Sequence, residues 1–488
     1  MLLKLLLMYI LDILMKEFCK TKIVATIGPS SWDLNVLKEM INNGMDVARI
    51  NASFADFDEL DRVSRVIRSI SPRVGLMLDT KGHKIRVSGF EKEKYLKEKD
   101  TLIIVSQGYF NSNQLSDKYI STTYPTLHQD ITRNSTILLD DGSIVLNVID
   151  IKGQEVLCEI IQGGILKPKK TVNVPNTHLN FPTLSDKDKE DIKYAVEHNF
   201  DYISASFIRN VTDVAVVREV MGKSNTKLIA KIEDREGIDN FDQILALVDG
   251  IMIARGDMGV EIPLQEVPVI QKQMVFKCRS VGKPVIVATQ MLESMRENIR
   301  PTRAEVSDVA NAIMDGCDAV MLSAETSTGQ YPIQSVTMMN DIALKVENVL
   351  RPQKVGGYTQ ASVETDELCS SIFDLTNNLH LKGIIVISQS GKTSLSLARH
   401  RLNIPIWEIS NDIQRIRQNS LVRGVKGYYL KDFPTDRDSA ILSSVECIYS
   451  YGELDLNDKI AIISGSSIKN RSNNSILEII KVKDVIGS

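Results

Sequence analysis

The sequence has few cysteines and almost no net charge. Only six of its 488 residues are cysteine, and they are scattered without a CxxC pair or any other metal-like spacing. This distribution excludes a disulfide framework and a cysteine-based zinc site, and it is typical of a reducing compartment. We therefore expect a cytoplasmic protein. The net charge is −4, with both signs mixed along the chain, so a nucleic-acid partner, which usually requires a basic face, is not expected.

Long apolar runs are also missing, except at the N-terminus. Residues Met1–Met15 are mostly Leu, Ile and Met, but Lys4 and Asp12 interrupt them. The run is shorter than the roughly 20 residues that a membrane helix needs, and no small-residue cleavage site follows it. We interpret residues 1–18 as an N-terminal extension, with Met15 as an alternative start and a membrane-surface helix as the other interpretation. No other stretch is a candidate membrane span, so no membrane partner is expected.

What the sequence does contain is a short apolar strand that recurs eight times and ends each time in polar residues. Between most of these strands lie segments with a helical period of 3.6 residues. Such an alternation is typical of a parallel sheet covered on its faces. Eight units predict an α/β fold built on a (β/α)₈ TIM barrel, and an open doubly wound sheet is the alternative. The strands are expected at Lys22–Gly28, Asp46–Asn51, Val74–Thr80, Tyr202–Phe207, Lys227–Glu233, Gly250–Asp257, Pro284–Met291 and Ala319–Glu325.

We expect the barrel at residues 19–86 and 184–350. Two other regions have a different sequence pattern. Residues 87–183 contain alternating β-type runs and turn signals such as Asp141-Gly142. They predict a small β-barrel domain inserted into a barrel loop, where it would act as a lid that excludes water. Residues 351–488 begin with a linker and then return to helices and strands. They predict a C-terminal α/β regulatory domain.

The strand ends carry charged residues that point to chemistry. In a TIM barrel the active site forms at the C-terminal ends of the strands. Glu233 and Asp257 follow neighbouring strands, and two carboxylates with positions left for water and substrate suit Mg²⁺ or Mn²⁺. The alternative is that each acid only caps a helix or pairs with an arginine.

Lys231 lies two residues before Glu233 and therefore projects to the same face of the strand. A lysine inside a barrel needs an anionic partner, and a transferring phosphoryl group is the natural one. A Schiff-base lysine is the competing interpretation. Arg255-Gly256-Asp257 turns from a strand into a helix, where glycine lets backbone N–H groups approach a carboxylate, and Thr289 could donate its hydroxyl to the same anion.

Eight stretches, in this order, resemble the pyruvate kinase family. The resemblance runs from about Lys20 to the end of the chain, and the pair VATQMLESM and PTRAEVSDVANAI is highly specific. It implies phosphoryl transfer from phosphoenolpyruvate to ADP, giving pyruvate and ATP in glycolysis, and a homotetramer. The stretches are KIVATIGPSS, DVARIN, LDTKG, IAKIE, ARGDMGVEI, VATQMLESM, PTRAEVSDVANAI and DAVMLSAETSTGQYP.

The resemblance also implies roles for individual residues. Glu233 and Asp257 match the Mg²⁺ ligands, and Lys231 and Arg49 match the cations that bind the phosphoryl group. Gly256, Asp257 and Thr289 match the cradle for the substrate carboxylate, and Ser323 matches a serine of the network that protonates the enolate. The nucleotide contacts would be Asn51, Arg86 and Lys187, and the monovalent-cation site would be Asn51, Ser53, Asp79 and Thr80.

Three departures from the family pattern bear on function. One is Asp234 directly after Glu233, which should point away from Glu233 and which we interpret as a surface or helix-start residue. His83 and Lys84 stand where the family usually has Pro and Glu. An ammonium at position 84 can supply the charge that K⁺ otherwise supplies, so we expect activity without K⁺. Ala52 and Phe54 stand where Phe and His are usual, and Phe54 cannot hydrogen-bond a phosphate. This change leaves nucleotide preference open.

The C-terminal region offers a candidate effector site between a predicted strand and helix. Ser388, Ser390, Gly391, Lys392 and Thr393 match the loop that binds phosphorylated effectors in the family, and an ordinary helix N-cap is the alternative. The polar loop after Ser464 lacks much of the usual glycine-rich pattern. A sugar monophosphate or a nucleotide monophosphate is therefore as well supported as fructose bisphosphate. A metabolite-binding homologue without turnover is the alternative function, and a barrel lyase is a third.

Overall fold

The computed structural model describes residues 18–109, 118–388, 390–465 and 475–487. Eight parallel strands close into a barrel in the order β1-β17-β16-β15-β14-β13-β3-β2, which confirms the predicted barrel and excludes the open sheet. The strands are β1 (Lys22–Thr26), β2 (Met45–Asn51), β3 (Gly75–Asp79), β13 (Tyr202–Ala205), β14 (Lys227–Ile232), β15 (Gly250–Ala254), β16 (Val285–Ala288) and β17 (Ala319–Leu322).

Helices surround this barrel and bury its outer face. Several begin at a side-chain cap, such as Ser185 before α5 and Thr302 before α11, where the hydroxyl accepts a backbone N–H three residues on. The principal helices are α2 (Leu34–Asn42), α3 (Phe57–Ile70), α5 (Asp186–Glu197), α6 (Val211–Met221), α8 (Phe241–Leu247), α10 (Val267–Ser280), α11 (Arg303–Asp315) and α13 (Pro332–Glu347). Their apolar faces pack with the strands into the largest buried cluster of the molecule.

A second sheet is inserted between β3 and α5, and we call it the inserted sheet. Its order is β12-β8-β9-β10-β6-β7-β4. A bridge between Arg86 and Thr171 joins residues next to the two edge strands, so the sheet nearly closes into a barrel around its own apolar core. The strands are β4 (Val87–Ser88), β6 (Thr101–Ser106), β7 (Tyr119–Thr122), β8 (Thr136–Leu139), β9 (Ile144–Lys152), β10 (Glu155–Gln162) and β12 (Val172–Asn173), beside a separate pair, β5 (Lys94–Leu96) and β11 (Gly164–Leu166).

The C-terminal part forms a five-stranded sheet in the order β20-β19-β18-β21-β22. Four strands are parallel, and β22 runs antiparallel to β21. The strands are β18 (Ile384–Ile387), β19 (Ile406–Ser410), β20 (Val425–Tyr429), β21 (Lys459–Gly465) and β22 (Ser475–Lys481), covered by α14 (Val363–Leu379), α15 (Lys392–Ala398), α16 (Ile413–Gln418) and α17 (Arg437–Ser450). Strand β22 was not predicted from the sequence.

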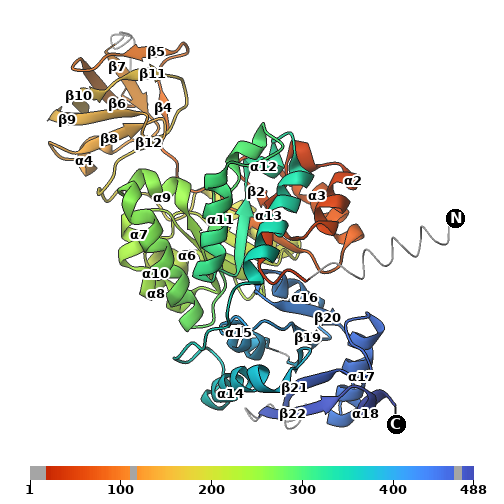
Figure 1. Ribbon diagram of the computed structural model, residues 1–488. Helices are drawn as coiled ribbons and strands as arrows, with labels where there is room; N and C mark the ends of the chain where they lie inside the picture. Colours follow the sequence, from red (N-terminus) through yellow and green to blue (C-terminus); the bar gives the residue numbers. More distant parts are fainter. Residues whose placement is uncertain (1–17, 110–117, 389, 466–474, 488) are drawn as a thin grey trace.

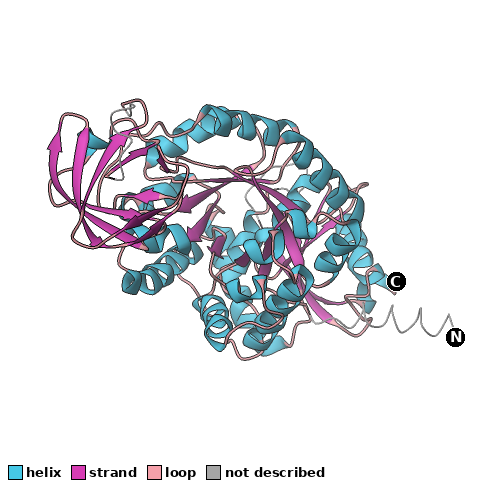
Figure 2. Cartoon of the chain, turned by 90° about the horizontal axis from the view of Figure 1, so that it is seen from above, coloured by secondary structure: helices cyan, strands magenta, loops and turns pink. Residues whose placement is uncertain are grey.

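The inserted sheet and the C-terminal sheet lie at opposite ends of the barrel (Figure 1), and the inserted sheet projects from the rest of the molecule (Figure 2). The short helix η5 (Asn419–Leu421) follows α16 and reaches the barrel floor. Leu421 is fully buried there among inward-facing side chains such as Met77 and Met252. The hydroxyl of Tyr202 on β13 donates to the carbonyl of Gln418 at 2.6 Å. The C-terminal part therefore closes the end of the barrel opposite the inserted sheet.

The structure bears on the membrane prediction, while the prediction for the N-terminus lies outside the described residues. No helix within the described ranges is long and apolar enough to cross a bilayer. The choice between an N-terminal extension and a membrane-surface helix falls on residues 1–17, which lie outside the described part of the chain. All six cysteines are free thiols, and four of them are buried.

Candidate active site

Charged side chains from four strand ends meet at the carboxyl end of the barrel. Asp79, at the end of β3, is the centre of this cluster. Its Oδ2 lies 2.8 Å from Nε of Arg49 on β2, and its Oδ1 lies 3.1 Å from Nζ of Lys231 on β14. All three residues are buried. Burial by itself raises the pKa of Asp79, but the two cations outweigh it and hold that pKa below its ordinary value.

Lys231 is held by three oxygen atoms. Besides Asp79, it donates to Oγ of Ser206 at 2.7 Å and lies 3.2 Å from Oε1 of Glu233. Burial favours the neutral amine, yet Asp79 and Glu233 raise the pKa of Lys231 above its ordinary value. The side chain is therefore a charged ammonium, which argues against the Schiff-base interpretation because that chemistry needs a neutral amine.

Glu233 follows β14 and is fully desolvated. Burial is the main reason that its pKa rises to about 7. Its Oε2 accepts the backbone N–H of Phe207 at 2.7 Å, and Phe207 adopts a left-handed φ of 52° to present that group. Its Oε1 makes no hydrogen bond within the described residues, but it is paired with the Lys231 ammonium at 3.2 Å. A carboxylate oxygen paired in this way can also face a metal ion.

Asp257 lies in the first turn of α9 (Arg255–Glu261), after β15. Its Oδ1 accepts a hydrogen bond from Nζ of Lys84 at 2.7 Å. Burial raises the pKa of Asp257, but the neighbouring ammonium groups of Lys84 and Lys231 hold it below its ordinary value. The carboxylate is therefore ionised at neutral pH.

Glu233 and Asp257 suit a divalent cation chemically. Both supply hard carboxylate oxygens, which divalent cations such as Mg²⁺ prefer. In the described ranges no group of three or more His, Cys, Asp or Glu side chains is arranged to hold a metal. Glu233 and Asp257 could therefore supply two ligands, and water and substrate oxygens would have to complete the coordination.

A turn after β16 brings Thr289 to the start of α9. The backbone N–H of Gly256 donates to Oγ1 of Thr289 at 2.7 Å, and a Cβ at position 256 would lie only 3.2 Å from that oxygen. Thr289 has φ +69°, an unfavourable backbone for a β-branched residue. Arg255 supports this turn by donating to the carbonyl of Thr289 at 2.7 Å. Strain of this kind is typical of functional sites.

Ser323 follows β17 on the next strand end. Its backbone N–H donates to Oε2 of Glu325 at 2.7 Å, and Oε1 of the same carboxylate accepts the N–H of Leu292. The Ser323 hydroxyl is buried and has no hydrogen-bond partner among the described residues. The hydroxyl is thus available to a substrate.

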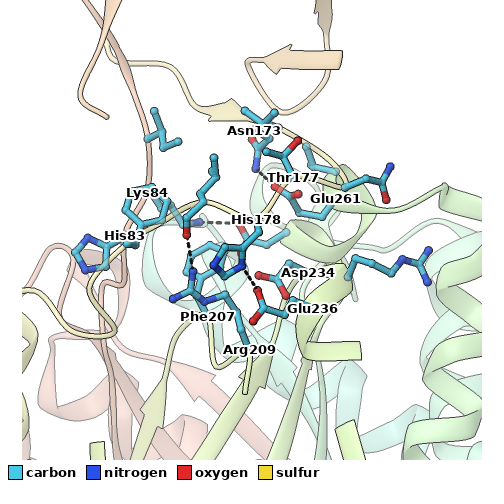
Figure 3. A pocket seen from close by; sticks show the side chains of 18 of the residues that line it. His83, Lys84, Asn173, Thr177, His178, Phe207, Arg209, Asp234, Glu236 and Glu261 are labelled. Carbon is cyan, nitrogen blue, oxygen red and sulfur yellow. Dashed lines mark hydrogen bonds and ion pairs between the residues drawn. The ribbon is translucent and has the colours of Figure 1, made fainter. Parts of the chain in front are cut away.

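A cavity of about 420 Å³ lies beside this cluster, between the inserted sheet and the barrel. Lys84 and Asp257 are part of its wall. Two contacts join its opposite walls (Figure 3). The side-chain amide of Asn173 on β12 donates to Oε1 of Glu261 at 2.7 Å, and Nδ1 of His178 lies 2.8 Å from Oε2 of Glu236. These contacts tie the inserted sheet and its return segment to the barrel.

The remaining predicted residues lie at different distances from the cluster. Thr80 is next to it, since the Ser206 hydroxyl donates to its carbonyl at 2.7 Å. Asn51 ends β2, and its side chain accepts the N–H of Ser53 at 3.0 Å. Arg86 and Lys187 make no hydrogen bond or ion pair with the cluster in the described residues. Arg86 donates to the carbonyl of Lys169, and Lys187 pairs with Asp191 within α5.

The candidate effector residues lie in the C-terminal part, after β18. The N–H of Gly391 donates to Oγ of Ser388 at 3.0 Å, and that of Lys392 to Oγ of Ser390 at 3.4 Å. Thr393 belongs to α15, which has only seven residues. Gln389 lies outside the described residues. Two hydroxyls of the loop therefore bond to its own backbone, while Gly391 at the N-cap of α15 makes no side-chain cap.

Comparisons with known proteins decide the family. The profile "Pyruvate kinase, barrel domain" matches residues 18–336, and "Pyruvate kinase, alpha/beta domain" matches residues 366–480. Pyruvate kinase of Geobacillus stearothermophilus is 39% identical over 484 residues, which cover 96% of this chain and 81% of that protein. The chain belongs to the pyruvate kinase family. Pyruvate kinase of Bacillus licheniformis is also 39% identical, over 96% of this chain and 81% of the relative.

A solved structure supports the same family. The crystal structure of a pyruvate kinase from Cryptosporidium parvum superposes with a TM-score of 0.88 at 32% identity. It covers 96% of this chain and 97% of the other. The barrel, the inserted sheet and the C-terminal sheet therefore all recur in a pyruvate kinase.

The structure also relates the departures from the pyruvate kinase pattern to the site. Lys84 contacts Asp257, and within the described ranges no hydrogen bond or ion pair joins it to Asn51, Ser53 or Thr80. Phe54 is 86% exposed. Asp234 begins helix α7 (Arg235–Asp239) by accepting the N–H of Gly237 at 2.8 Å, as expected of a helix-start residue.

Three positioning residues received no role from the sequence. Ser206 and Glu325 fall at the ends of two predicted strands, and Arg255 opens the turn after a third. Ser206 holds Lys231, Arg255 holds the Thr289 turn, and Glu325 holds the backbone of Ser323. Their position at the strand ends was the available signal, but their contacts join strands far apart in the chain and cannot be deduced from spacing.

Proposed function

We propose that this protein is a catalytically active pyruvate kinase, which transfers the phosphoryl group of phosphoenolpyruvate to ADP with the help of Mg²⁺ or Mn²⁺. The observation that carries the proposal is the Lys231 ammonium between Asp79, Ser206 and Glu233. A fixed cation next to two metal-type carboxylates is what phosphoryl transfer requires, because its catalysis consists mainly of positioning and charge neutralisation.

In this mechanism Arg49 and Lys231 bind the phosphoryl oxygens of phosphoenolpyruvate from one side. Their geometry is fixed in advance by the shared partner Asp79, so little reorganisation is needed as charge develops. Glu233 and Asp257 would hold the divalent cation, which when bound neutralises charge on the phosphoryl and substrate oxygens.

The Gly256–Thr289 corner would receive the carboxylate of phosphoenolpyruvate. The backbone N–H groups at the start of α9 and the Thr289 hydroxyl are donors of the kind that bind an anion. After transfer, the enolate requires a proton, and the unpartnered Ser323 hydroxyl supports its place in the network that delivers this proton. Asn51, Arg86 and Lys187 would contact the nucleotide phosphates, and the inserted sheet would exclude water as it closes.

The test is a coupled assay in which lactate dehydrogenase and NADH report pyruvate formed from phosphoenolpyruvate and ADP. We expect steady turnover that requires Mg²⁺ or Mn²⁺ and both substrates. A folded protein that binds metal and phosphoenolpyruvate but forms no pyruvate would instead be the metabolite-binding homologue.

We further propose that turnover does not need K⁺. Asn51, Ser53, Asp79 and Thr80 would form the monovalent-cation site of the family. Here both Asp79 oxygens are already bonded to cations, and Lys84 adds an ammonium through Asp257.

Initial rates with K⁺ and with tetramethylammonium at equal ionic strength should agree within about twofold, because fixed ammonium groups replace the mobile cation. Lys84→Glu should make the rate depend on K⁺. Strong activation of the wild-type protein by K⁺ would contradict this proposal.

The finer features of regulation and assembly are proposals as well. We propose a cytoplasmic homotetramer, supported by six free thiols and by exposed apolar side chains on and beside α10. The loop of Ser388, Ser390, Gly391, Lys392 and Thr393 would bind the phosphate of an effector, either a sugar monophosphate or a nucleotide monophosphate.

A further inference from the structure

Lys84 belongs to the segment that leads from β3 out to the inserted sheet, yet its side chain turns back to the barrel (Figure 3). Its Nζ lies 2.7 Å from Oδ1 of Asp257, a hydrogen-bonded ion pair between two partly exposed side chains. The ammonium thus lies against one of the two carboxylates proposed to hold the divalent metal.

We propose that Lys84 is an internal competitor of the divalent cation, which must leave Asp257 before the metal can bind with full affinity. The inference rests on the proposed function, in which Asp257 is a metal ligand. It concerns the affinity of the substrate-free protein for the divalent metal. It is separate from any effect of Lys84 on the K⁺ requirement.

The first argument is one of shared ligand atoms. An oxygen that accepts a hydrogen bond from an ammonium at 2.7 Å has part of its coordination sphere filled. A divalent cation on the same carboxylate would lie within a few ångströms of that ammonium, and like charges at such a distance repel strongly in a partly desolvated site. Lys84 and the metal therefore cannot both keep their best positions.

The second argument is one of charge balance. The cluster contains three cations, Arg49, Lys84 and Lys231, and three carboxylates, Asp79, Glu233 and Asp257. With Glu233 ionised, these charges cancel without a metal. Adding a divalent cation leaves an excess of two positive charges, unless one cation moves away or an anionic substrate binds.

The third argument identifies Lys84 as the cation that moves. Lys231 is held by three oxygens and its side chain is 11% exposed, whereas Lys84 is hydrogen-bonded only to Asp257 among the described residues and its side chain is 33% exposed. A lysine side chain is flexible and its ammonium is strongly hydrated. Lys84 can therefore leave Asp257 and turn into the neighbouring cavity at a small cost in free energy. The phosphoryl or carboxylate oxygens of a bound substrate would offer the released ammonium a new partner.

Direct titration of the full-length protein with Mn²⁺, followed by the electron paramagnetic resonance signal of the free aquo ion, tests this competition without any turnover. In the absence of substrates, Lys84→Met should tighten Mn²⁺ binding about tenfold, the order of magnitude of a partly exposed ion pair. Lys81→Met, which removes an exposed lysine from the same segment, is the matched control and should leave the affinity unchanged.

The outcomes separate the competition from the metal site itself. Asp257→Asn should weaken Mn²⁺ binding. If it does, and Lys84→Met binds Mn²⁺ no more tightly than Lys81→Met, the competition is wrong while the metal site stands. If Asp257→Asn binds Mn²⁺ like the wild type, both the competition and the metal site of the proposed function are wrong.

A second measurement uses the wild-type protein and so does not depend on how a variant folds. Acetic anhydride labels lysine amines, and mass spectrometry reports the extent at each position. Saturating Mn²⁺ should raise labelling of Lys84 several-fold, because loss of its carboxylate partner exposes the amine, and should leave Lys81 unchanged. Equal labelling of Lys84 with and without Mn²⁺ would overturn the proposal.

Discussion

Glu261 lies where the inserted sheet meets the barrel, and it accepts a hydrogen bond from Asn173 at 2.7 Å. Burial is the main cause that raises its pKa from 4.5 to about 7. In the folded protein Glu261 is therefore protonated below about pH 7, whereas in the unfolded chain it stays ionised down to about pH 4.5. The stabilisation that results is fully present below about pH 4.5 and is lost as the pH rises through about 7.

Glu261→Gln should remove this pH dependence, because the amide keeps an oxygen for Asn173 and never ionises. In metal-free buffer the variant should gain stability over the wild type, and the gain should be larger at pH 8 than at pH 5.5 by roughly 1–2 kcal/mol. Thermal unfolding midpoints at the two pH values measure it. Glu297→Gln, at an exposed glutamate, is the control. An equal effect of Glu261→Gln at both pH values would contradict the assignment.

The sequence predicts the positions of some site residues but not the contacts of others. The strand-end spacing predicted that Lys231, Glu233 and Asp257 face one cavity, because strand periodicity and barrel topology are regular. It did not predict the partner of Lys84, which lies 173 positions away in Asp257. It also missed Glu261, whose burial depends on where the inserted sheet packs. Such contacts depend on tertiary packing between segments that no local pattern relates.

Among the elements, the short segment of α16 and η5 has a larger structural role than its length suggests. It places Leu421 in the core of the barrel floor, beneath the strands that carry the candidate catalytic residues. The Tyr202 hydroxyl bonds to the carbonyl of Gln418 at 2.6 Å and fixes the segment against β13. A change in the C-terminal sheet would therefore reach the barrel interior through this contact.

Leu421→Ala should open a cavity in that core and cost about 2–5 kcal/mol of stability. The thermal midpoint should fall well below that of Leu442→Ala, which truncates a partly exposed leucine on α17 and should change stability by less than about 0.5 kcal/mol. Differential scanning calorimetry compares the two variants. Equal midpoints would show that Leu421 does not anchor the barrel floor.

The elements of the barrel were predictable because short apolar strands and amphipathic helices alternate along it. The sequence did not predict the plug formed by α16 and η5, since residues 413–421 have the polar composition of a surface segment. They are buried only by tertiary contacts, such as Leu421 with the barrel floor and Arg415 with Glu408 of the C-terminal sheet. Strand β22 was also missed. A polar stretch separates it from β21 in the sequence and gives no indication that the chain returns to pair with that strand.

At the scale of the whole molecule, the inserted sheet, the barrel and the C-terminal sheet are arranged in a row (Figure 1). The proposed catalytic cluster lies under the inserted sheet, and the candidate effector loop lies in the C-terminal part. Leu264, Val269 and Phe276 are exposed on the side of the barrel. Apolar side chains that gather on one face mark an interaction surface.

We expect these side chains to be covered by a second copy of the chain in the homotetramer. Size-exclusion chromatography with light scattering should give a mass of about four times 54.5 kDa. Phe276→Glu should lower that mass by placing a charge in the contact, whereas Tyr358→Glu, at an exposed residue of the linker, should not. A monomeric wild-type mass at micromolar concentration would contradict the assembly.

The measurement that tests the account most directly is ³¹P NMR of phosphoenolpyruvate and ADP incubated with the protein and Mg²⁺. The wild type should convert the phosphoenolpyruvate resonance into the γ-phosphate resonance of ATP. Lys231→Met should slow this conversion by about a thousandfold or more, because it removes the cation that stabilises the transferring group. Lys283→Met, which removes a buried lysine that donates to the carbonyls of Leu245 and Ala246, should lower stability but not the rate per folded molecule. An inert wild type, or a Lys231→Met protein as fast as the wild type, would contradict the proposed role of the cluster.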